Sequence, residues 1–395
     1  RFINVQPPVT NWISEDGFVG WCVACGAAKH ERERPGIGVQ CDDCRGDILP
    51  GEFRHYVSPS SFRTDFRPED GDIDDVGVMS TRTVATVARE GKPHDVGSIR
   101  IHAGAGTTIM QLNDGRPNEL GEQQLFEVEI MTDQEVATFP RGVQLPMQAI
   151  DTSVSIKDKN RRFQRTDDGI GQFGLFARKA TEAVFVEAKR VNQRLNIDLV
   201  AKAGDRTHIA ARAAAISATH LLVQKAALKL DVAPDEFEAL EPRLRHGRPM
   251  LQVADTLING SGLCRRLCQT AADGRPDIAR LIEEILTARD KWPLADFMDA
   301  EHEAQCSTSC YMCIQQYQNR RYHPLLDWRL GLAYLRSMTD PAFQCGLDGD
   351  FDSYPELKGW LEKAQALAEA VASMRPKSWR AELSGPMRLP CLVEM

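Results

Sequence analysis

Four cysteines near the start of the chain have the spacing of a metal site. Cys22 and Cys25 form one Cys-x2-Cys pair, and Cys41 and Cys44 form a second pair after fifteen intervening residues. Each pair presents two thiolates about one ion's width apart, and four thiolates can close a tetrahedron around Zn²⁺. A closed site leaves no position for water, so the spacing predicts a structural zinc site and not a catalytic one. Two separate pairs of free thiols are the alternative.

A second group of metal-ligating residue types follows much later in the chain. Cys306, Cys310 and Cys313 place three thiols within eight residues, and His302 stands one helical turn before the first of them. His302 is therefore the nearest candidate for a fourth ligand. Three other cysteines remain open for that position: Cys264, Cys268 and Cys345. The run from His302 to Cys306 looks like a hydrolase HExxH motif without its second histidine, which favours a closed structural site over a hydrolytic one. Buried thiols without a metal are the alternative.

Catalytic motifs are weaker. The sequence contains no P-loop and no G-x-S-x-G motif, and the glycine-rich stretch 104–108 lacks a phosphate-binding lysine. We therefore expect no ATP hydrolysis by a P-loop mechanism from this chain alone. One pattern suits a metal-dependent nuclease: Glu187 and Lys189 follow an apolar run, with Asp167 and Asp168 upstream. Two carboxylates can hold Mg²⁺ beside an attacked phosphate, although a strand that ends in a solvated basic segment fits the same residues.

The block that contains the second cysteine group resembles a known domain signature. Residues Cys306–Arg329 (CSTSCYMCIQQYQNRRYHPLLDWR) are similar to the cysteine-rich signature of the helicase-associated zinc-binding (MZB) domain found at the C-terminus of superfamily 2 helicases. Upstream, Asp255–Leu263 (DTLINGSGL) resembles the turn that precedes this signature in the family. The order of elements agrees over roughly Thr181–Met338. Where the family often has another cysteine, this chain has Ala304, which leaves the fourth ligand open.

The resemblance implies a non-catalytic module or partner of a DNA helicase or translocase, stabilised by two Zn²⁺ ions. A cysteine-rich head without a motor is most similar to subunits that accompany a separate superfamily 2 helicase in bacterial DISARM phage defence. The other possibility is a C-terminal piece of a larger helicase, with the motor in the same polypeptide. A zinc-stabilised platform could also direct four cationic side chains at DNA phosphates: Arg320, Arg321, His323 and Arg329. Ion pairing on a helix surface, with Asp327 as a local partner, is the alternative for these residues.

We expect an α+β fold of three regions that position the candidate metal ligands and DNA-contact residues. We expect a zinc-ribbon-like N-terminal module over residues 1–56, a β-rich middle region over 57–200 and a helical, MZB-like zinc-binding domain over 201–395. β-Branched residues and partial alternation predict strands in the middle of the chain. The predicted strands are Val76–Val87, Gly97–Leu112 and Gln124–Met131, with further candidates at Ala183–Val186 and Ile197–Val200.

Helices are expected after Gly204, where Asp205 and Thr207 are candidate N-caps. An apolar stripe with helical spacing predicts the first helix; it consists of Ile209, Ala213, Ile216, His220, Val223, Ala227 and Leu230. Because His220 lies on that stripe, it is expected to be a core histidine and not a ligand. Pro276 suits the first turn of the next helix, whose inward residues would be Ile278, Leu281, Ile282 and Ile285. Two more helices are predicted over Leu325–Ser337 and Glu356–Met374.

Composition limits the remaining classes. The chain has 395 residues, eleven cysteines and a net charge of −8, which excludes a uniformly basic nucleic-acid coat protein. One basic stretch stands out, with fourteen Lys/Arg against eight Asp/Glu between Asp151 and Lys225. With no signal peptide and no run of eighteen apolar residues, we expect a reducing, cytoplasmic location and no membrane partner. The first residue is Arg1, as expected for a piece of a longer polypeptide.

Overall fold

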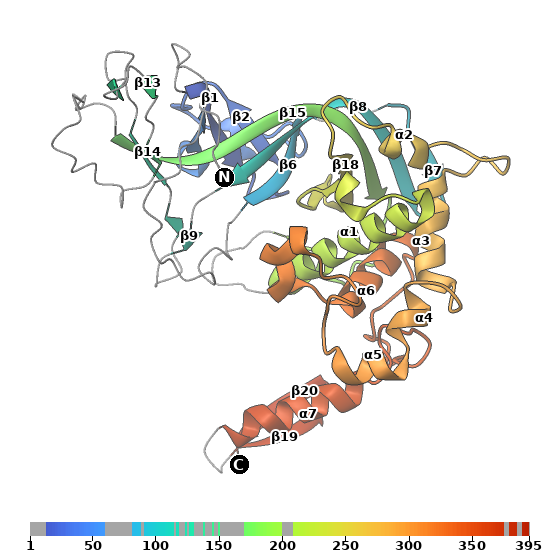
Figure 1. Ribbon diagram of the computed structural model, residues 1–395. Coiled ribbons are helices and arrows are strands. Elements are labelled where there is room, and N and C mark those ends of the chain that lie inside the picture. Colours follow the sequence, from blue (N-terminus) through green and yellow to red (C-terminus); the bar gives the residue numbers. More distant parts are fainter. Residues whose placement is uncertain are drawn as a thin grey trace. The chain divides into compact units, whose positions relative to one another are not determined.

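The computed structural model describes residues 13–59, 81–87, 91–113, 170–199, 208–374, 379–384 and 389–394, together with short paired segments between residues 116 and 150. These residues form a mixed α+β protein (Figure 1), which confirms the predicted fold class. The chain divides into two compact units, one of residues 1–88 and 107–180 and one of residues 89–106 and 181–395. This division differs from the predicted boundaries after residues 56 and 200, because two long strands, β8 (Ile99–Asn113) and β15 (Ile170–Ala188), each contribute to both units.

The first unit is built on a β-sheet. β1 (Ile13–Trp21) pairs antiparallel with β2 (Ala28–Glu31) and with β5 (Arg54–Pro59), and β5 pairs in parallel with β15. β6 (Thr81–Val87) pairs antiparallel with β8. Side chains from these strands form one hydrophobic core, which consists of Val19, Ala28, Tyr56, Val84, Met110, Leu112 and Phe176. Residues two apart along a strand, such as Met110 and Leu112, point to the same face, so the sheet buries one face in this core.

The other strands of the first unit are short. β3 (Val39–Gln40) and β4 (Asp47–Ile48) form a small hairpin, and a 3₁₀ turn, η1 (Pro50–Glu52), follows it. Between residues 116 and 150 the described segments are β9 (Arg116–Pro117), β10 (Gln123–Gln124), β11 (Phe126–Glu129), β12 (Ala137–Thr138), β13 (Gln144–Leu145) and β14 (Ala149–Ile150). β11 pairs with both β14 and β15, which attaches this region to the first unit.

The predicted strands agree with the structure except near residue 197. The first three correspond to β6, β8 and β11, with residues 76–80, 125, 130 and 131 outside the described ranges, and Ala183–Val186 lies in β15. Residues 197–199 are not a strand, and Val200 is not described. The side chains of Asn192 and Asn196 accept hydrogen bonds from backbone amides two residues on, at 3.0 and 2.9 Å. Such local hydrogen bonds favour turns over a strand ladder.

The second unit combines a small sheet with helices. The second half of β15 pairs antiparallel with β18 (Arg248–Asp255), and β18 also pairs with β16 (Phe237–Ala239) and β17 (Arg243–Arg245). A short 3₁₀ turn, η4 (Pro234–Glu236), leads into β16, and β7 (His94–Val96) forms a hairpin with the start of β8. Seven of the eight residues of β18 are buried, so both faces of this strand are covered.

Helix α1 (His208–Leu230) is the centre of the second unit and lies beside α6 (Trp328–Thr339), as Figure 1 shows. It also packs on α3 (Asp277–Thr287) and β18. The helices approach closely at Gly331, where an added Cβ would lie 2.8 Å from a methyl carbon of Leu221. The predicted stripe is buried except for Ile209, and His220 is a buried core histidine as predicted. The candidate caps Asp205 and Thr207 lie outside the described residues.

The remaining helices are α2 (Leu263–Leu267), α4 (Leu294–Phe297), α5 (Ala300–Gln305), η5 (Tyr317–Leu325, a 3₁₀ helix) and α7 (Trp360–Ser373). The four predicted inward residues of α3 are buried, and Pro276 directly precedes this helix. The two later helices begin at Trp328 and Trp360, a few residues after their predicted starts. α7 packs on the hairpin of β19 (Trp379–Ser384) and β20 (Leu389–Glu394).

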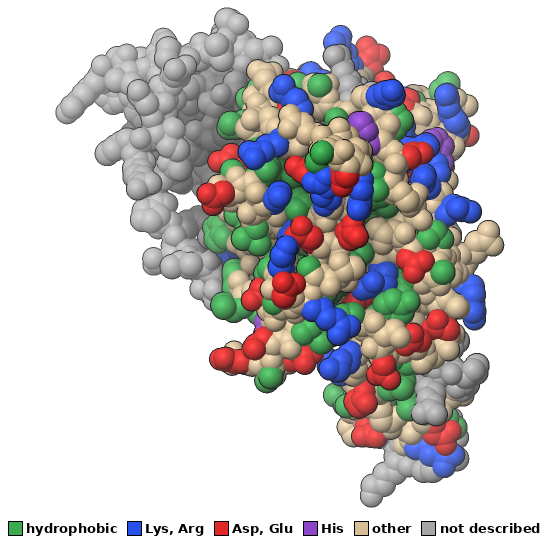
Figure 2. Space-filling model, turned by 90° about the vertical axis from the view of Figure 1, so that its right-hand side faces the viewer, with side chains coloured by type: hydrophobic (Ala, Val, Ile, Leu, Met, Phe, Trp, Pro, Cys, Tyr) green, Lys and Arg blue, Asp and Glu red, His purple; other side chains and the backbone are tan. Residues whose placement is uncertain are grey.

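Helix composition and surface charge can be compared with those of membrane-spanning and strongly charged proteins. Within the described ranges, no helix combines the length and the apolar character needed to cross a membrane. On the face shown in Figure 2, Lys/Arg and Asp/Glu side chains are interspersed and do not form separate fields of one sign.

Candidate metal centres

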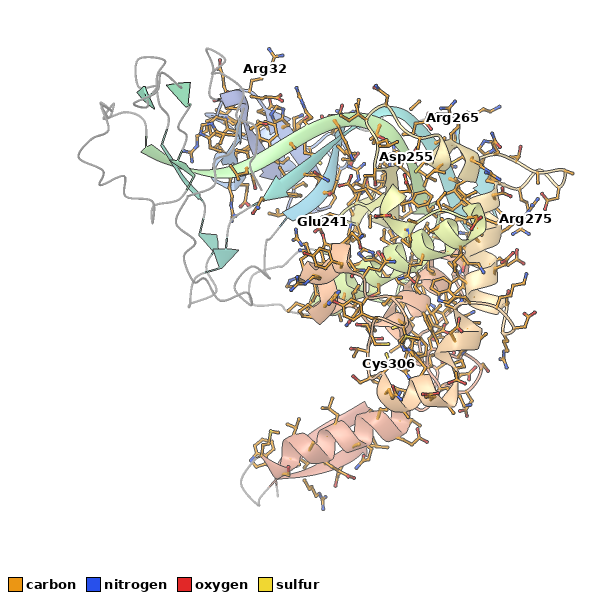
Figure 3. The ribbon with its side chains drawn as sticks, viewed as in Figure 1. Arg32, Glu241, Asp255, Arg265, Arg275 and Cys306 are labelled. Carbon is orange, nitrogen blue, oxygen red and sulfur yellow. The ribbon has the colours of Figure 1, made fainter. Side chains whose placement is uncertain are left out.

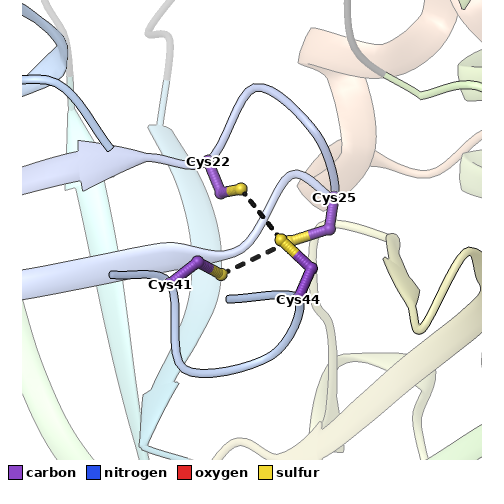
Figure 4. A group of neighbouring side chains, drawn as sticks. All are labelled: Cys22, Cys25, Cys41 and Cys44. Atoms are coloured by element: carbon purple, nitrogen blue, oxygen red, sulfur yellow. Dashed lines mark hydrogen bonds between the residues drawn. The ribbon is translucent and has the colours of Figure 1, made fainter. Parts of the chain in front are cut away.

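The first cysteine group lies in two tight turns of the first unit (Figure 4). Cys22 and Cys25 lie in the connection from β1 to β2, and Cys41 and Cys44 lie in the hairpin of β3 and β4. The Sγ atoms of Cys22 and Cys44 are 3.4 Å apart, and those of Cys25 and Cys41 are 3.6 Å apart. All four sulfur atoms lie within 4.8 Å of one another. A tetrahedron with Zn–S bonds of 2.3 Å has edges of about 3.8 Å, so the group fits a zinc ion.

The two turns have the same backbone hydrogen bonds. The amide of the first cysteine donates to the carbonyl five residues on, at 2.9 Å for Cys22 and 2.8 Å for Cys41. The amide four residues on donates to the first cysteine's carbonyl, at 2.8 and 3.1 Å. The residue after the second cysteine, Gly26 or Arg45, has a φ of 76° or 64°. This left-handed residue reverses the chain, so each turn directs both of its thiols to the same point.

The pKa values of these thiols indicate how a bound cation would change their charge. Burial is the main cause that raises the pKa values of Cys22 and Cys25 above the usual range. At Cys44 burial also acts to raise the pKa, but the amide of Gly46, 3.4 Å from the sulfur, and the neighbouring thiols lower it overall. Without a cation the buried members would be neutral thiols. A bound Zn²⁺ would supply the charge that stabilises four thiolates.

The second group has a mixed donor set in the second unit. The Sγ atoms of Cys306 and Cys313 are 3.8 Å apart, and Sγ of Cys310 is 3.6 Å from Nε2 of His302. Zinc bonds of 2.3 Å to sulfur and about 2.05 Å to nitrogen give tetrahedral edges of about 3.8 Å for S···S and 3.6 Å for S···N. All four donors lie within 4.8 Å of one another, so this group also fits a zinc ion. The described residues therefore contain two clusters that can bind two zinc ions, as predicted.

The structure places His302, and not one of the three alternative cysteines, with this group. Helix α5 begins just before it, because the carboxylate of Asp299 accepts hydrogen bonds from the amides of Glu301 (2.9 Å) and His302 (3.3 Å). Nδ1 of His302 lies 3.3 Å from the carbonyl oxygen of Phe297. When Nδ1 donates to that oxygen, Nε2 is left with a free lone pair for a metal. The Phe297 ring also stacks on the imidazole, at 5.7 Å between centroids.

The thiols of the second group are largely enclosed. Cys306 and Cys313 are buried, and burial is the main cause that raises both of their pKa values. The amide of Cys310 donates to the sulfur of Cys313 at 3.0 Å. Such N–H···S contacts favour the thiolate form that a metal needs. With four protein donors in each cluster, neither has an open position for a reacting water.

Three of the four predicted DNA-contact residues have partners within the protein: Arg329, Arg321 and His323. The guanidinium of Arg329 donates to the carbonyl of Ser307 (3.2 Å), lies 3.6 Å from the carboxylate of Glu303 and covers the ring of Trp328 at 4.0 Å. Its side chain is 13% exposed. Arg329 therefore connects the start of α6 to α5 and to the cysteine loop.

Arg321 is half-buried, lies 3.9 Å from the carboxylate of Glu241 and covers the ring of Tyr322 at 4.7 Å. Nε2 of His323 is 3.0 Å from both the carbonyl of Gln316 and Oδ1 of Asn319. Arg320, in contrast, is exposed and lies over the ring of Tyr317 at 5.3 Å. DNA contact by Arg320, Arg321, His323 and Arg329 stays a prediction, and Arg320 is the most accessible of the four.

The carboxylate of Glu187, in the alternative nuclease pattern, has partners within the protein. Glu187 is 2% exposed, and its carboxylate lies 2.8 Å from the guanidinium of Arg248 and 3.6 Å from the imidazole of His102. Burial acts to raise the pKa of Glu187, but the neighbouring imidazole of His102 and the charge of Arg248 hold it below the usual range. The carboxylate of Glu187 is thus paired with the Arg248 guanidinium and lies beside the His102 imidazole.

The other members of that pattern are not brought to Glu187 by the described residues. The ammonium of Lys189 lies 3.8 Å from the carboxylate of Asp95. Asp167 and Asp168 lie outside the described ranges. Within those ranges, the metal-suited groups of three or more donors are the two cysteine clusters, and Glu187 belongs to neither.

The turn after β18 is organised by a residue whose role the sequence did not reveal. The side chain of Asp255 is fully buried, and its carboxylate accepts hydrogen bonds from four successive backbone amides. These are the amides of Ser261 (2.8 Å), Gly262 (2.8 Å), Leu263 (3.2 Å) and Cys264 (2.8 Å). Figure 3 shows Asp255 near the start of α2. Amides that could have held a phosphate at this turn are therefore bonded to the protein's own carboxylate.

A second residue missed by sequence reasoning is Glu241, also labelled in Figure 3. Its carboxylate accepts hydrogen bonds from the guanidinium of Arg212 (2.9 Å) and the hydroxyl of Tyr322 (2.5 Å). These contacts connect α1, the segment after β16 and η5. No local pattern indicates them, because Tyr322 lies 81 residues from Glu241 in the sequence.

Comparisons with known proteins give little beyond this geometry. No protein-family model matches the chain, and no curated protein matches it. Among solved structures, the chain is similar to the crystal structure of the DUF1998 helicase MrfA bound to DNA, with 12% sequence identity and a TM-score of 0.32. The match covers 62% of this chain and 25% of the helicase chain, so this chain spans about a quarter of that protein. A TM-score this low supports no conclusion about shared fold or function.

Proposed function

We propose that this chain is a non-catalytic, zinc-binding module or partner of a DNA helicase or translocase. The observation that carries the proposal is the second cluster, in which His302 joins Cys306, Cys310 and Cys313 at distances suited to tetrahedral zinc. These cysteines begin the block that resembles the signature of the helicase-associated zinc-binding domain. Four protein ligands at each cluster give the metal a structural role.

The residues around the clusters support a role in holding surfaces in place. In the first unit, zinc would cross-link two separate turns, one with Cys22 and Cys25 and one with Cys41 and Cys44. In the second unit, it would hold the cysteine loop, to which Arg329 attaches α6. When bound, the metal would contribute charge neutralisation and cross-linking. The chain's own residues then determine which surfaces are presented to a motor protein and to DNA.

The more specific assignment is a DrmB-like subunit of a DISARM phage-defence system, located in the bacterial cytoplasm and acting with a DrmA-like helicase on phage DNA. It rests on the cysteine-rich N-terminal module and on the lack of a P-loop in these 395 residues. The alternative within the same class is a C-terminal piece of a larger helicase whose motor belongs to the same polypeptide. In either case the chain would support ATP-driven translocation by a separate motor domain.

Co-expression with a superfamily 2 helicase subunit encoded beside this chain tests the proposal. We expect about two zinc ions per chain by elemental analysis, a stable complex with the helicase, and tighter DNA binding by the complex than by either part. A plasmid should stay uncut in Mg²⁺. The proposal would be contradicted if the chain bound neither the helicase nor DNA.

The nuclease alternative is decided in the same assay. Mg²⁺-dependent cleavage of the plasmid that is lost in Glu187→Ala, but retained in a control such as Glu369→Ala on an exposed face of α7, would replace the proposed function with that of an enzyme. Because the carboxylate of Glu187 is held by Arg248 and His102, we expect no cleavage by any of these proteins.

A further inference from the structure

We propose that the segment after Cys310 carries a stacking surface for the bases of single-stranded DNA. This surface, the knuckle surface, consists of Tyr311, Met312, Tyr317 and Arg320. The inference rests on the proposed function and names the form of DNA that this part of the chain would bind. It differs from the phosphate contacts predicted from sequence, because its main contribution comes from aromatic rings.

Exposure singles out these side chains. Tyr311 is 65% exposed, Met312 is 82% exposed and Tyr317 is 73% exposed. The chain has six tyrosines, and the other four are buried or half-buried. Single exposed apolar residues are common on protein surfaces. Here, however, the two most exposed tyrosines occur within seven residues, beside a candidate metal cluster.

The backbone beneath the knuckle surface is held on both sides. Tyr311 and Met312 lie inside the Cys310–Cys313 turn, which is closed by the hydrogen bond from the Cys310 amide to the Cys313 sulfur. Tyr317 opens η5, where Oδ1 of the buried Asn319 accepts a hydrogen bond from the Gln316 amide at 2.8 Å. A surface that is already ordered loses little conformational entropy when a ligand binds.

The contacts of the two rings keep them at the surface. Tyr311 meets the imidazole of His323 edge-on, with 5.4 Å between centroids and 83° between planes. His323 in turn contacts Gln316, the residue before Tyr317. The guanidinium of Arg320 lies 5.3 Å from the centre of the Tyr317 ring. Aromatic rings beside an arginine are the elements with which proteins bind unpaired bases, since every base has a π-face.

Charge favours a nucleic acid over a protein as the partner. The chain has 56 acidic residues, but none lies between Ala304 and Leu326, a segment that contains Arg320 and Arg321. Because Arg321 lies beside Glu241, Arg320 is the exposed cation of this segment, and it favours a polyanion although the whole chain is acidic. Glutamines at positions 315, 316 and 318 separate the apolar side chains. A protein-binding centre is instead typically a continuous, desolvated apolar core.

Base stacking also agrees with the contacts of the neighbouring basic residues. Arg321, His323 and Arg329 have the internal partners described above, so broad neutralisation of phosphates by this region is not available in the observed arrangement. The two exposed rings and Arg320 remain to contact a ligand. Bases stacked in a duplex do not present their faces, and the surface should therefore prefer single strands.

Fluorescence anisotropy with the full, zinc-loaded chain and a labelled oligothymidine of roughly 16 nucleotides tests this inference. We expect Tyr311→Ala and Tyr317→Ala each to weaken binding by about 5- to 150-fold, the loss of one stacked base. Phenylalanine at either position keeps the ring and should preserve affinity. Leucine keeps an apolar side chain but loses the ring, and it should weaken binding as alanine does. Met374→Ala, at another methionine that is 82% exposed, is the control and should bind normally.

The salt dependence of the DNA affinity distinguishes the contribution of the aromatic rings from that of the charged side chain. The tyrosine variants should leave the dependence of affinity on salt unchanged, whereas Arg320→Ala should reduce its slope by about one ion. An abasic oligonucleotide of the same length should bind more weakly, and so should the duplex. Equal binding of the abasic strand, wild-type affinity in the alanine or leucine variants, or no binding of the oligonucleotide by the wild-type chain would overturn the inference.

The proposed function is judged separately on the same samples. Zinc content and complex formation with the helicase are measured for every variant. If the tyrosine variants bind DNA normally but lose the helicase, the knuckle surface binds protein and the inference fails while the proposed function stands. If the wild-type chain binds neither helicase nor any form of DNA, both fail.

Discussion

Replacement of Asp255 by asparagine should strongly destabilise the turn between β18 and α2. In the native protein, one carboxylate oxygen accepts the amides of Ser261, Gly262 and Leu263, and the other accepts the amide of Cys264. An asparagine side chain has one accepting oxygen and one donating NH₂ group. In either orientation, at least one backbone amide then faces a donor and loses its acceptor. The remaining bonds lose the assistance of the negative charge.

The size of the effect follows from burial. Asp255 is 0% exposed, so water cannot replace the lost acceptor. A buried donor without an acceptor costs about 1–3 kcal/mol, and hydrogen bonds to a charged group are worth roughly 1 kcal/mol more than neutral ones. With at least one amide unsatisfied and the others weakened, we expect a loss of about 3 kcal/mol or more. This is a large part of the roughly 5–15 kcal/mol that stabilises a typical domain.

Hydrogen exchange measured by mass spectrometry gives a local readout. A loss of about 3 kcal/mol should speed exchange at residues 261–264 on the order of 100-fold. Asp340→Asn is a matched control, because Asp340 accepts a single amide at an exposed turn and should change stability by less than about 0.5 kcal/mol. If Asp255→Asn left both exchange at 261–264 and the denaturation midpoint unchanged, the carboxylate would not organise this turn and our account of it would be wrong.

Three further predictions concern the second unit. His302→Ala should lower the zinc content from about two ions per chain to about one, whereas Cys345→Ala should not; elemental analysis that showed the reverse would assign the fourth ligand to the cysteine. Burial lowers the pKa of His220 from 6.5 to about 4, so its contribution to stability is complete above pH 6.5 and is lost as the pH falls toward 4. The unfolding free energy of the wild type should therefore fall by about 2 kcal/mol more than that of His220→Gln between pH 7.5 and 5, and parallel losses would refute this assignment. Gly331→Val should lower stability by about 1–3 kcal/mol in denaturant titrations, because its side chain would force Leu221 and α6 apart; an unchanged midpoint would show that the helices can separate freely.

Sequence reasoning was most successful where the relevant contacts are local. A Cys-x2-Cys pair forms a turn by itself, and His302 lies one helical turn from Cys306, which made it the nearest of the four candidates for the fourth ligand. The apolar stripe of α1 is likewise a local pattern, and it correctly identified His220 as a core residue. Helix starts were less accurate, since the cap at Asp327 depends on backbone geometry just before α6.

Long-range contacts explain what the sequence did not reveal. Glu241 contacts residues 29 and 81 positions away, which no local pattern indicates. The same difficulty affected the cationic residues after Cys313, because the partners of Arg321 and Arg329 are set by packing against other elements. The predicted division near residue 200 did not anticipate β15, because a strand of nineteen residues that contributes to two units carries no marker of a boundary.

Zinc ions at the two clusters would stabilise different kinds of structure. In the first cluster, the sulfur atoms in contact belong to residues that are 22 positions apart in one pair and 16 positions apart in the other. A zinc ion there would cross-link two separate turns and reduce the conformational freedom of this segment in the unfolded chain. In the second, all four donors fall within twelve residues, and a cross-link over so short a span can do little to connect distant elements. A zinc ion there would shape the loop itself, which Arg329 and the amide of Trp328 attach to α6. A loop held in this way, with two tyrosines exposed on it, is better suited to present a surface than to stabilise the helical unit.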